Sequence, residues 1–468
     1  AAASGGATRG GAPGPPLHIH DHEVNRKVHV GEAAWEAGLQ RVPGNRGGAR
    51  RFLRRLRANR TVRIVLFGGS IVKGWGCCHQ TCTQEQQDDC AWGGRLRERL
   101  QQAAPGAHVV VQSRARRGFT SRSFLPEVSA WLRSLLEAPD VVIWDFVVND
   151  RMDGSGSYPE RAGDAAAAVE TVVRWVRALL PRTQLILGAM VPNRDGETNR
   201  SYMQEMLVDV ARHYDIPLVS FLDVVEAHVQ AGGKLKDVWI PGMNMVHPAR
   251  RAHEGFADVI CRLFNAELDA LDSGGPAAAA ADDLEPPVAR RDFDDPDPLP
   301  WLHEASSDVP HSCMPVTRHV PDAPTKATPR RSRRGTWQLA EDSPGKPGWI
   351  AQGSPTARSP KQDDWLEFPV AFGSRPVLTV QFVKSYSGMG DAEVRLLEKA
   401  YTLRGYWESS SSQAFTVYFN ASAPHSAEPI GEVSYVRHGF GVTPNSEGTL
   451  QVRLVAGAKF KLLGVFTC

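Results

Sequence analysis

The sequence lacks a run of about 20 apolar residues, the length that a membrane-spanning helix requires, so no such span is predicted. It also lacks a strong excess of one charge: the formal net charge is +2 over 468 residues, which gives no indication of a nucleic-acid partner. Basic clusters at 50–57, 114–117 and 330–334 do not alternate with aromatic residues, so solvated surfaces or linker charge are expected. Because the chain begins at Ala1 rather than Met, the sequence says nothing of a signal peptide.

Cysteine is scarce and unevenly placed. Four of the seven cysteines lie between Cys77 and Cys90, with His79 among them. The adjacent Cys77-Cys78 pair is not the usual zinc-ligand spacing, and no second Cys/His pair follows at finger spacing, so disulfides are favoured over zinc or free thiols. The odd count leaves at least one thiol unpaired or intermolecular. Disulfides favour a secreted protein or one in the endomembrane lumen. Three Asn-x-Ser/Thr triplets are compatible with that route, at Asn59, Asn199 and Asn420.

Composition divides the chain into four segments. Residues 1–61 form a Gly/Ala/Pro-rich N-terminal extension that is expected to be partly disordered, with short helices over 33–57. Its alternating His18, His20 and His22 suit either a metal site or, preferably, a loosely attached segment. Residues 272–335 form a Pro/Ala/Asp/Arg-rich linker, in which 331–334 suits a processing protease or simply a basic linker. Two folded domains are therefore predicted, over 62–271 and 336–468.

Residues 62–271 alternate between apolar, strand-like runs and amphipathic stretches with helical spacing. Strands are predicted at Val62–Phe67, His108–Gln112, Val141–Val148, Gln184–Met190 and Pro217–Phe221. Helices are predicted at Trp92–Ala103, Phe124–Glu137, Ala162–Leu180, Tyr202–Tyr214 and Ala249–Leu271. Continuous apolar strands separated by helices indicate a parallel sheet covered on both faces. The predicted fold is a three-layer α/β/α, flavodoxin-like domain, whose ligand site lies beyond the carboxyl ends of the strands.

Residues 336–468 have no helix signals and many short β-type runs. These runs are Trp365–Val370, Pro376–Val383, Ala392–Leu397, Ala414–Phe419, Gly431–Tyr435, Thr449–Val455 and Phe460–Phe466. Gly, Pro, Asn and Ser separate them, which is typical of an antiparallel β-sandwich or jelly roll. Five aromatic residues suit either a sugar-binding platform or, preferably, core packing: Trp337, Trp349, Trp365, Tyr406 and Trp407.

Four residues follow the predicted strands at positions where chemistry is expected. Ser70 comes after Gly68-Gly69 at the end of the first strand, Gly118 follows the second, and Asn149 the third. His247-Pro248 precedes the last helix. Each has an ordinary alternative: a turn serine, a loop glycine, a helix cap or a packed histidine. Because the carboxyl ends of parallel strands share one edge, all four are expected at one crevice.

In this order, the four residues resemble the SGNH (GDSL-like) hydrolase/esterase family, and the resemblance covers about 62–271. His253, six positions after His247, is similar to the family's last block. The resemblance implies that Ser70 attacks an ester carbonyl and that His247 is its general base. It also implies an oxyanion hole made of the backbone N–H groups of Ser70 and Gly118 and the side chain of Asn149. No cofactor and no metal are implied.

Two positions depart from the family. Gly69 stands where the family usually has Asp, and Asn244 stands three residues before His247, where the triad acid is expected. An amide can orient an imidazole but cannot balance its positive charge, and in a serine triad this change costs about 10⁴ in turnover. Asp237 is the nearest acidic alternative.

The expected function is therefore a serine esterase that removes an acyl group, such as acetyl, from a carbohydrate or related polymer. The expected partner is a small-molecule or polymeric ester substrate, without nucleic acid and without a membrane span. Two alternatives stay open. One is a catalytically weak or inactive binding protein with the SGNH fold, which Asn244 motivates. The other is a sugar O-acyltransferase that uses the same serine.

Overall fold

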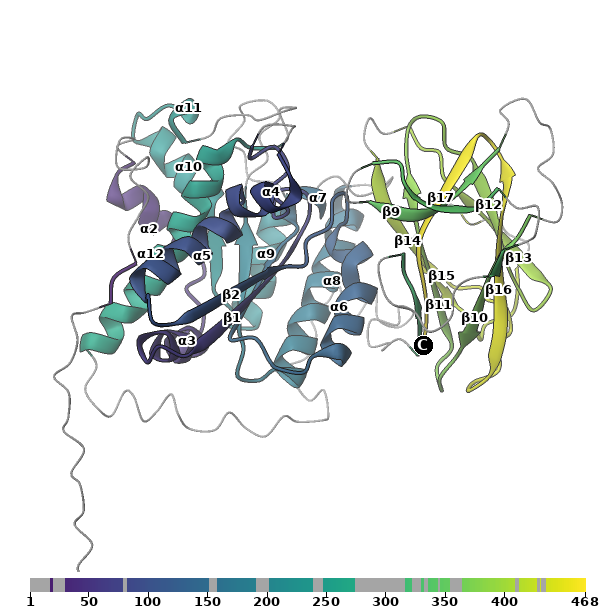
Figure 1. Ribbon diagram of the computed structural model, residues 1–468, viewed down its shortest axis with the longest axis horizontal. Coiled ribbons are helices and arrows are strands. Elements are labelled where there is room, and N and C mark those ends of the chain that lie inside the picture. The colour runs from purple at the N-terminus through teal and green to yellow at the C-terminus, as the bar shows by residue number, and fades with distance from the viewer. Residues whose placement is uncertain are drawn as a thin grey trace, which may run out of the picture.

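The computed structural model describes the chain in segments: residues 17–19, 30–78, 82–150, 158–190, 202–238, 247–273, 316–321, 330–331, 336–343, 346–353, 364–408, 412–426, 430 and 435–468. A helix-covered sheet and an all-β part lie side by side (Figure 1). His20, His22, His79, Asn199 and Asn244 lie outside the described residues.

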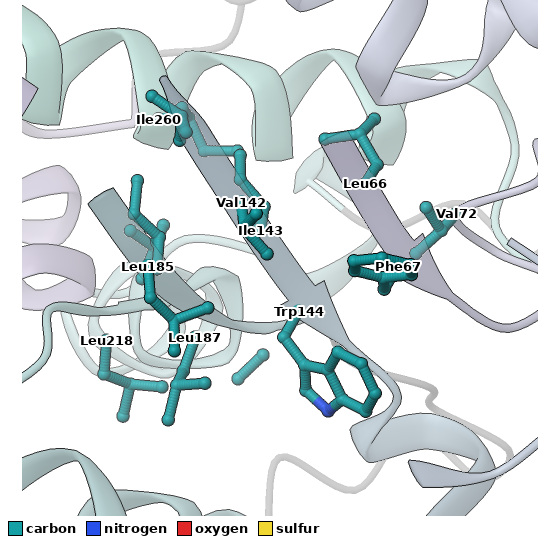
Figure 2. Packing of buried hydrophobic residues seen from close by; sticks show 14 of the residues in the cluster. Leu66, Phe67, Val72, Val142, Ile143, Trp144, Leu185, Leu187, Leu218 and Ile260 are labelled. Atoms are coloured by element: carbon teal, nitrogen blue, oxygen red, sulfur yellow. The ribbon is translucent and has the colours of Figure 1, made fainter. Parts of the chain in front are cut away.

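The first part contains a five-stranded parallel sheet in the order β2-β1-β3-β4-β5. Its strands are β1 (Thr61–Gly68), β2 (His108–Ser113), β3 (Val141–Asp145), β4 (Gln184–Ala189) and β5 (Leu218–Ser220). Every residue of β3, β4 and β5 is buried, as expected for strands covered on both faces. Figure 2 shows buried side chains from three strands of the sheet in the hydrophobic core, among them Leu66 of β1, Ile143 of β3 and Leu187 of β4.

Helices cover both faces of this sheet, which confirms the predicted three-layer fold. One layer contains α3 (Gly47–Arg57), α5 (Trp92–Ala103) and α12 (Arg250–Ser273), and the other contains α6 (Ser121–Ser134), α8 (Tyr158–Leu179) and α9 (Tyr202–His213). The pair α2 (Glu32–Gln40) and α10 (Phe221–Gln230) pack together beside β5. The short helices are α4 (Gln84–Cys90), α7 (Val147–Asp150) and α11 (Leu235–Val238). In α3 the apolar face, with Phe52 and Leu56, is buried, while Arg50 pairs with Glu267 of α12 at 2.8 Å.

The all-β part consists of two sheets that enclose one hydrophobic core. The first has the order β13-β12-β16-β10-β7, and the second has the order β15-β14-β11-β17-β9-β8, with β6 paired to β17. All pairs are antiparallel except β14 with β15, so the predicted antiparallel architecture is confirmed. The strands are β6 (Thr317–His319), β7 (Arg330–Arg331), β8 (Gln338–Glu341), β9 (Pro347–Gln352), β10 (Leu366–Ala371), β11 (Val377–Lys384), β12 (Asp391–Leu396), β13 (Lys399–Arg404), β14 (Gln413–Asn420), β15 (Tyr435–Val436), β16 (Glu447–Ala456) and β17 (Lys459–Thr467).

Several elements differ from their predicted extent. The strand predicted to reach residue 148 ends at Asp145, because the backbone N–H groups of Asn149 and Asp150 both donate to Phe146 O and close a helical turn. Asn149 therefore lies in α7 rather than at a strand end. Strands β6 and β7 lie within the segment predicted as a linker. Most of the run predicted at 431–435 lies outside the described residues.

The aromatic residues of the β part do not form one exposed platform. Trp337, Trp349 and Trp407 are buried, with exposed fractions of 2%, 3% and 5%. The ring of Trp365 is covered by two guanidinium groups, each 4.6 Å from its centroid, whereas Tyr406 is half exposed. Core packing is therefore the role of at least three of the five.

The second sheet of the β part packs against α6 and the loop that precedes it. The backbone N–H of Ala414 donates to Gly118 O at 2.8 Å, and Tyr418 Oη donates to Arg122 O at 3.0 Å. Gln381 also donates to Ser123 O. The buried side chain of Ala414 belongs to the core of the α/β part. The contact between the two parts therefore includes the loop that holds Gly118.

The cysteines agree with the disulfide interpretation. Cys77 is bonded to Cys90 and Cys78 to Cys82, and Cys468 is also disulfide-bonded. Cys261 is a buried free thiol. Within the described ranges, no helix is long and apolar enough to cross a membrane, and no group of three or more His, Cys, Asp or Glu side chains is arranged to hold a metal ion.

Candidate active site

Ser70 and His247 meet beyond the carboxyl end of β1. His247 Nε2 lies 2.8 Å from Ser70 Oγ, although the residues are 177 positions apart in the sequence. A serine hydroxyl hydrogen-bonded to an imidazole is the arrangement in which the imidazole can remove the hydroxyl proton during nucleophilic attack. The structure therefore brings together the two residues that the sequence analysis selected as nucleophile and base.

Close backbone approaches position both residues. A Cβ on Gly68 would lie 2.6 Å from Asp145 O on the neighbouring strand, so the chain can leave the sheet here only with a very small residue. Past the serine, the backbone N–H of Trp75 donates to Ser70 O at 2.9 Å and closes the turn. At Gly76, φ is +86°, and a Cβ would lie 2.6 Å from His247 Cβ. Gly76, which the sequence analysis missed, therefore provides the space for the histidine.

The imidazole of His247 is kept neutral by its surroundings. Burial is the largest cause, and the positive charges of Arg117 and Lys346 add to it, so that the pKa of His247 falls to about 4. A neutral imidazole can accept a proton, so the ring is in the form that a general base needs at any pH well above 4.

The loop after β2 runs beside the end of β1. The backbone N–H of Arg116 donates to Gly68 O at 2.9 Å, which places the following residues next to the serine loop. Gly118 has φ of +75°, a conformation that favours glycine. The carboxylate of Asp150 accepts from the backbone N–H and the hydroxyl of Ser121, at 2.6 and 2.7 Å, and so ties α7 to the start of α6. Asp150, another residue that the sequence analysis missed, holds the loops of Gly118 and Asn149 together.

The side chain of Asn149 lies directly against Gly69. A Cβ on Gly69 would lie 2.6 Å from Asn149 Cγ and 2.9 Å from its Nδ2, so even an alanine would displace the amide. This contact gives a physical reason for the glycine that precedes the nucleophile, where the sequence analysis noted a departure from the family.

His253 is a structural anchor in the helix that follows His247. It is fully buried, and its Nδ1 accepts the backbone N–H of Trp92 at 3.3 Å. Burial lowers the pKa of His253 to about 3, so the ring is neutral. It thereby fastens the first turn of α12 to the start of α5, six residues from the active histidine.

The sequence analysis offered two residues as partners that orient His247, Asn244 and Asp237. Asn244, the predicted orienting residue, lies outside the described residues. Asp237 accepts the backbone N–H of Lys234 at 3.0 Å and lies 3.7 Å from His228 Nε2. Its contacts thus hold it on α11, near His228.

Two basic residues beside the site come from different parts of the chain. The guanidinium of Arg117 lies 3.2 Å from the centroid of the Trp75 ring, and only 8% of the residue is exposed. The Nζ atom of Lys346, the residue that precedes β9, lies 3.4 Å from the position of a Cβ on Gly118. The sequence analysis predicted that the basic cluster containing Arg117 is solvated. For Arg117 this prediction is wrong, because the side chain is buried. No sequence signal pointed to Lys346, since it lies in the other domain.

A cavity of about 540 Å³ adjoins these residues at the junction of the two parts. The loop 113–117 and Lys73 form one side, and strands β8, β9, β11, β14 and β17 contribute to the other. Its polar lining includes Ser385, Ser412 and Gln413. The cavity thus offers room and hydrogen-bonding groups for a ligand near the Ser70 loop.

Part of the chain matches a known family, and the whole chain resembles a solved structure in its fold. Residues 66–254 match the model of the GDSL-like lipase/acylhydrolase family. The chain is also similar to a solved two-domain esterase described as active on acetylated mannans, in a structure with mannopentaose (19% identity, TM-score 0.56) and in one without it (19%, 0.54). Each covers 92% of this chain and 97% of the other. At this identity the likeness concerns the fold. No curated protein sequence matches this chain.

Proposed function

We propose that the protein is a serine esterase acting on an acylated carbohydrate, a proposal that proceeds from the match of residues 66–254 to the GDSL-like lipase/acylhydrolase family. The observation that carries the proposal is the 2.8 Å hydrogen bond between Ser70 Oγ and His247 Nε2 beyond the sheet edge. The neutral state of the imidazole, caused by burial and by two nearby positive charges, supports the same role.

In the proposed reaction, Ser70 Oγ forms a bond to the ester carbonyl carbon while His247 takes the hydroxyl proton. The backbone N–H groups of Ser70 and Gly118 and the Asn149 amide donate to the resulting oxyanion. Collapse of this intermediate breaks the bond to the sugar oxygen, which leaves as an alcohol with the proton from His247. A water molecule then attacks the acyl-serine by the same steps and releases the carboxylic acid.

The carbohydrate part of the proposal rests on the second domain and on the cavity at the junction. The lining of hydroxyl, amide and basic side chains suits a hydroxyl-rich ligand. The similar two-domain esterase is described as active on acetylated mannans, and it matches the whole arrangement of two domains rather than the α/β part alone. Disulfides and the predicted glycosylation triplets support a secreted or endomembrane location.

A binding protein without turnover is the second candidate, and Asn244 in place of the triad acid favours it. A serine-directed fluorophosphonate distinguishes the two. One adduct on the peptide that contains Ser70, absent from Ser70→Ala, is expected for the esterase, whereas an unmodified protein would support the binding role. If Asn244 orients His247, Asn244→Asp is expected to raise turnover, by up to about 10⁴.

A further inference from the structure

The cavity beside the Ser70 loop is strongly basic. Seven of its lining residues are basic and only two, Glu341 and Asp342, are acidic; the basic ones are Lys73, Arg114, Arg116, Arg117, Lys346, Lys459 and Lys461. The net charge of the whole chain is only +2. Positive charge is therefore concentrated at this junction, and electrostatic attraction to an anion is expected there.

Much of this charge is already compensated by neighbouring carboxylates. Lys459 and Lys461 both pair with Asp342. Arg116 lies 3.4 Å from Glu127, and Lys73 lies 3.3 Å from Asp88. These four side chains have partners within the protein, so they explain only part of the basic character.

Arg117 and Lys346 are different. In the described part of the chain, neither has a carboxylate at ion-pair distance; Glu341 and Asp342 influence them only at longer range. Burial lowers the pKa of Arg117 to about 10 and that of Lys346 to about 8, and the charge of Arg117 contributes to the effect on Lys346. Two like charges that are withdrawn from water in the same place destabilise the folded protein. A bound anion would relieve this cost.

The position of the pair connects it to the proposed reaction. Arg117 directly precedes Gly118, and the Nζ of Lys346 lies beside Gly118. Both side chains line the cavity. The stacking of Arg117 on Trp75, five residues after the nucleophile, fixes its guanidinium next to the serine loop. An anion held here would therefore lie close to the ester that Ser70 attacks.

We propose that the protein prefers an acidic carbohydrate, whose carboxylate or sulfate group is bound by Arg117 and Lys346 while Ser70 removes an acyl group nearby. This inference rests on the proposed esterase function and adds the charge of the substrate to it. Arg117 supplies a planar guanidinium that binds such an oxyanion through two N–H groups, and Lys346 supplies a point charge. The second domain thus determines specificity, because it contributes Lys346 to a site that the first domain alone would leave incomplete.

Binding to the Ser70→Ala protein tests the inference without requiring turnover. An acetylated oligogalacturonate and its methyl ester share the same sugar chain, but the ester replaces each carboxylate charge by a small neutral group. A sulfated oligosaccharide and its desulfated form distinguish sulfate from carboxylate. Calorimetry is expected to give a dissociation constant at least about tenfold lower for one of the two anionic probes than for its neutral form. Adding Lys346→Gln is expected to abolish most of this preference. Lys399→Gln is the matched control, because it removes an equal charge on the edge strand β13, away from the cavity. This variant is expected to keep the preference for the anionic probe.

Equal affinities for the charged and neutral forms of both pairs would overturn the inference, as would a preference that Lys346→Gln leaves unchanged. No measurable binding of any of the four probes would overturn it as well. Hydrolysis of p-nitrophenyl acetate by the wild type, lost in Ser70→Ala, reports the esterase function separately. If the protein hydrolyses p-nitrophenyl acetate but does not prefer the anionic probes, only the inference of an acidic substrate is refuted, and the esterase function stands.

Discussion

Replacing Gly69 by alanine is expected to impair turnover while the protein stays folded. The glycine has no unusual φ angle, so alanine can adopt its backbone conformation. The added Cβ would lie 2.6 Å from Asn149 Cγ and 2.9 Å from its Nδ2, well inside the separation of about 3.5–4.0 Å that non-bonded carbon atoms prefer. The amide must therefore move by about 1 Å or more, away from the position at which it is proposed to stabilise the oxyanion.

The magnitude follows from the role of the displaced group. Losing one oxyanion donor costs about 10²–10³ in kcat, or about 2.7–4 kcal/mol. The cost in folding is smaller, because the atoms that must yield are the end of one side chain rather than backbone, and about 1 kcal/mol is expected. Gly69→Ala should therefore lose most of its activity while it keeps most of its folding stability.

The assay compares kcat for p-nitrophenyl acetate and urea unfolding in Gly69→Ala, Asn149→Ala and the double variant. The double variant is expected to be no slower than Asn149→Ala, because both changes remove the same donor. Gly31→Ala is the matched control, since a Cβ there meets nothing within 4 Å. Wild-type kcat in Gly69→Ala, or fully multiplicative losses in the double variant, would refute the reasoning about Asn149.

Two further predictions concern pH and stability. His247 acts in its neutral form, and its lowered pKa of about 4 places the acid limb of kcat/KM near that pH instead of near 6.5. Lys346→Gln removes one cause of the lowering and should shift the limb to higher pH; a limb near 6.5 in the wild type would contradict this. Asp258→Ala, which leaves Arg99 buried without its ion-pair partner, should cost about 3–5 kcal/mol in urea unfolding. Asp89→Ala breaks an exposed pair and should cost at most about 1 kcal/mol, so equal losses would count against the burial argument.

The parallel sheet could be predicted from sequence because its strands are continuous apolar runs separated by amphipathic helices. The shape of the loops could not. Asn149 was placed at the end of a strand, but a turn closed on Phe146 O puts it in a short helix. Local hydrogen bonds decide whether the chain continues as a strand after five buried residues or turns into a helix. Hydrophobic periodicity does not report these hydrogen bonds.

Ser70 and His247 could be predicted because each follows or precedes a predicted element in a recognisable order along the chain. The other residues of the site could not be predicted, because they reach it through contacts between distant segments. Lys346 reaches Gly118 only because the β part packs on the loop before α6, and a lone lysine in sequence carries no such information. Likewise, Arg117 looked like one member of a solvated cluster, and only the fold shows that it is buried against Trp75.

The most direct test of the account is hydrolysis of p-nitrophenyl acetate by the wild type, Ser70→Ala and Ser374→Ala, measured side by side. Ser374 is exposed on the β part and serves as the matched serine control. The account predicts turnover in the wild type and in Ser374→Ala, with a loss of about 10³-fold or more in Ser70→Ala. Equal rates in all three proteins would contradict a nucleophilic role for Ser70.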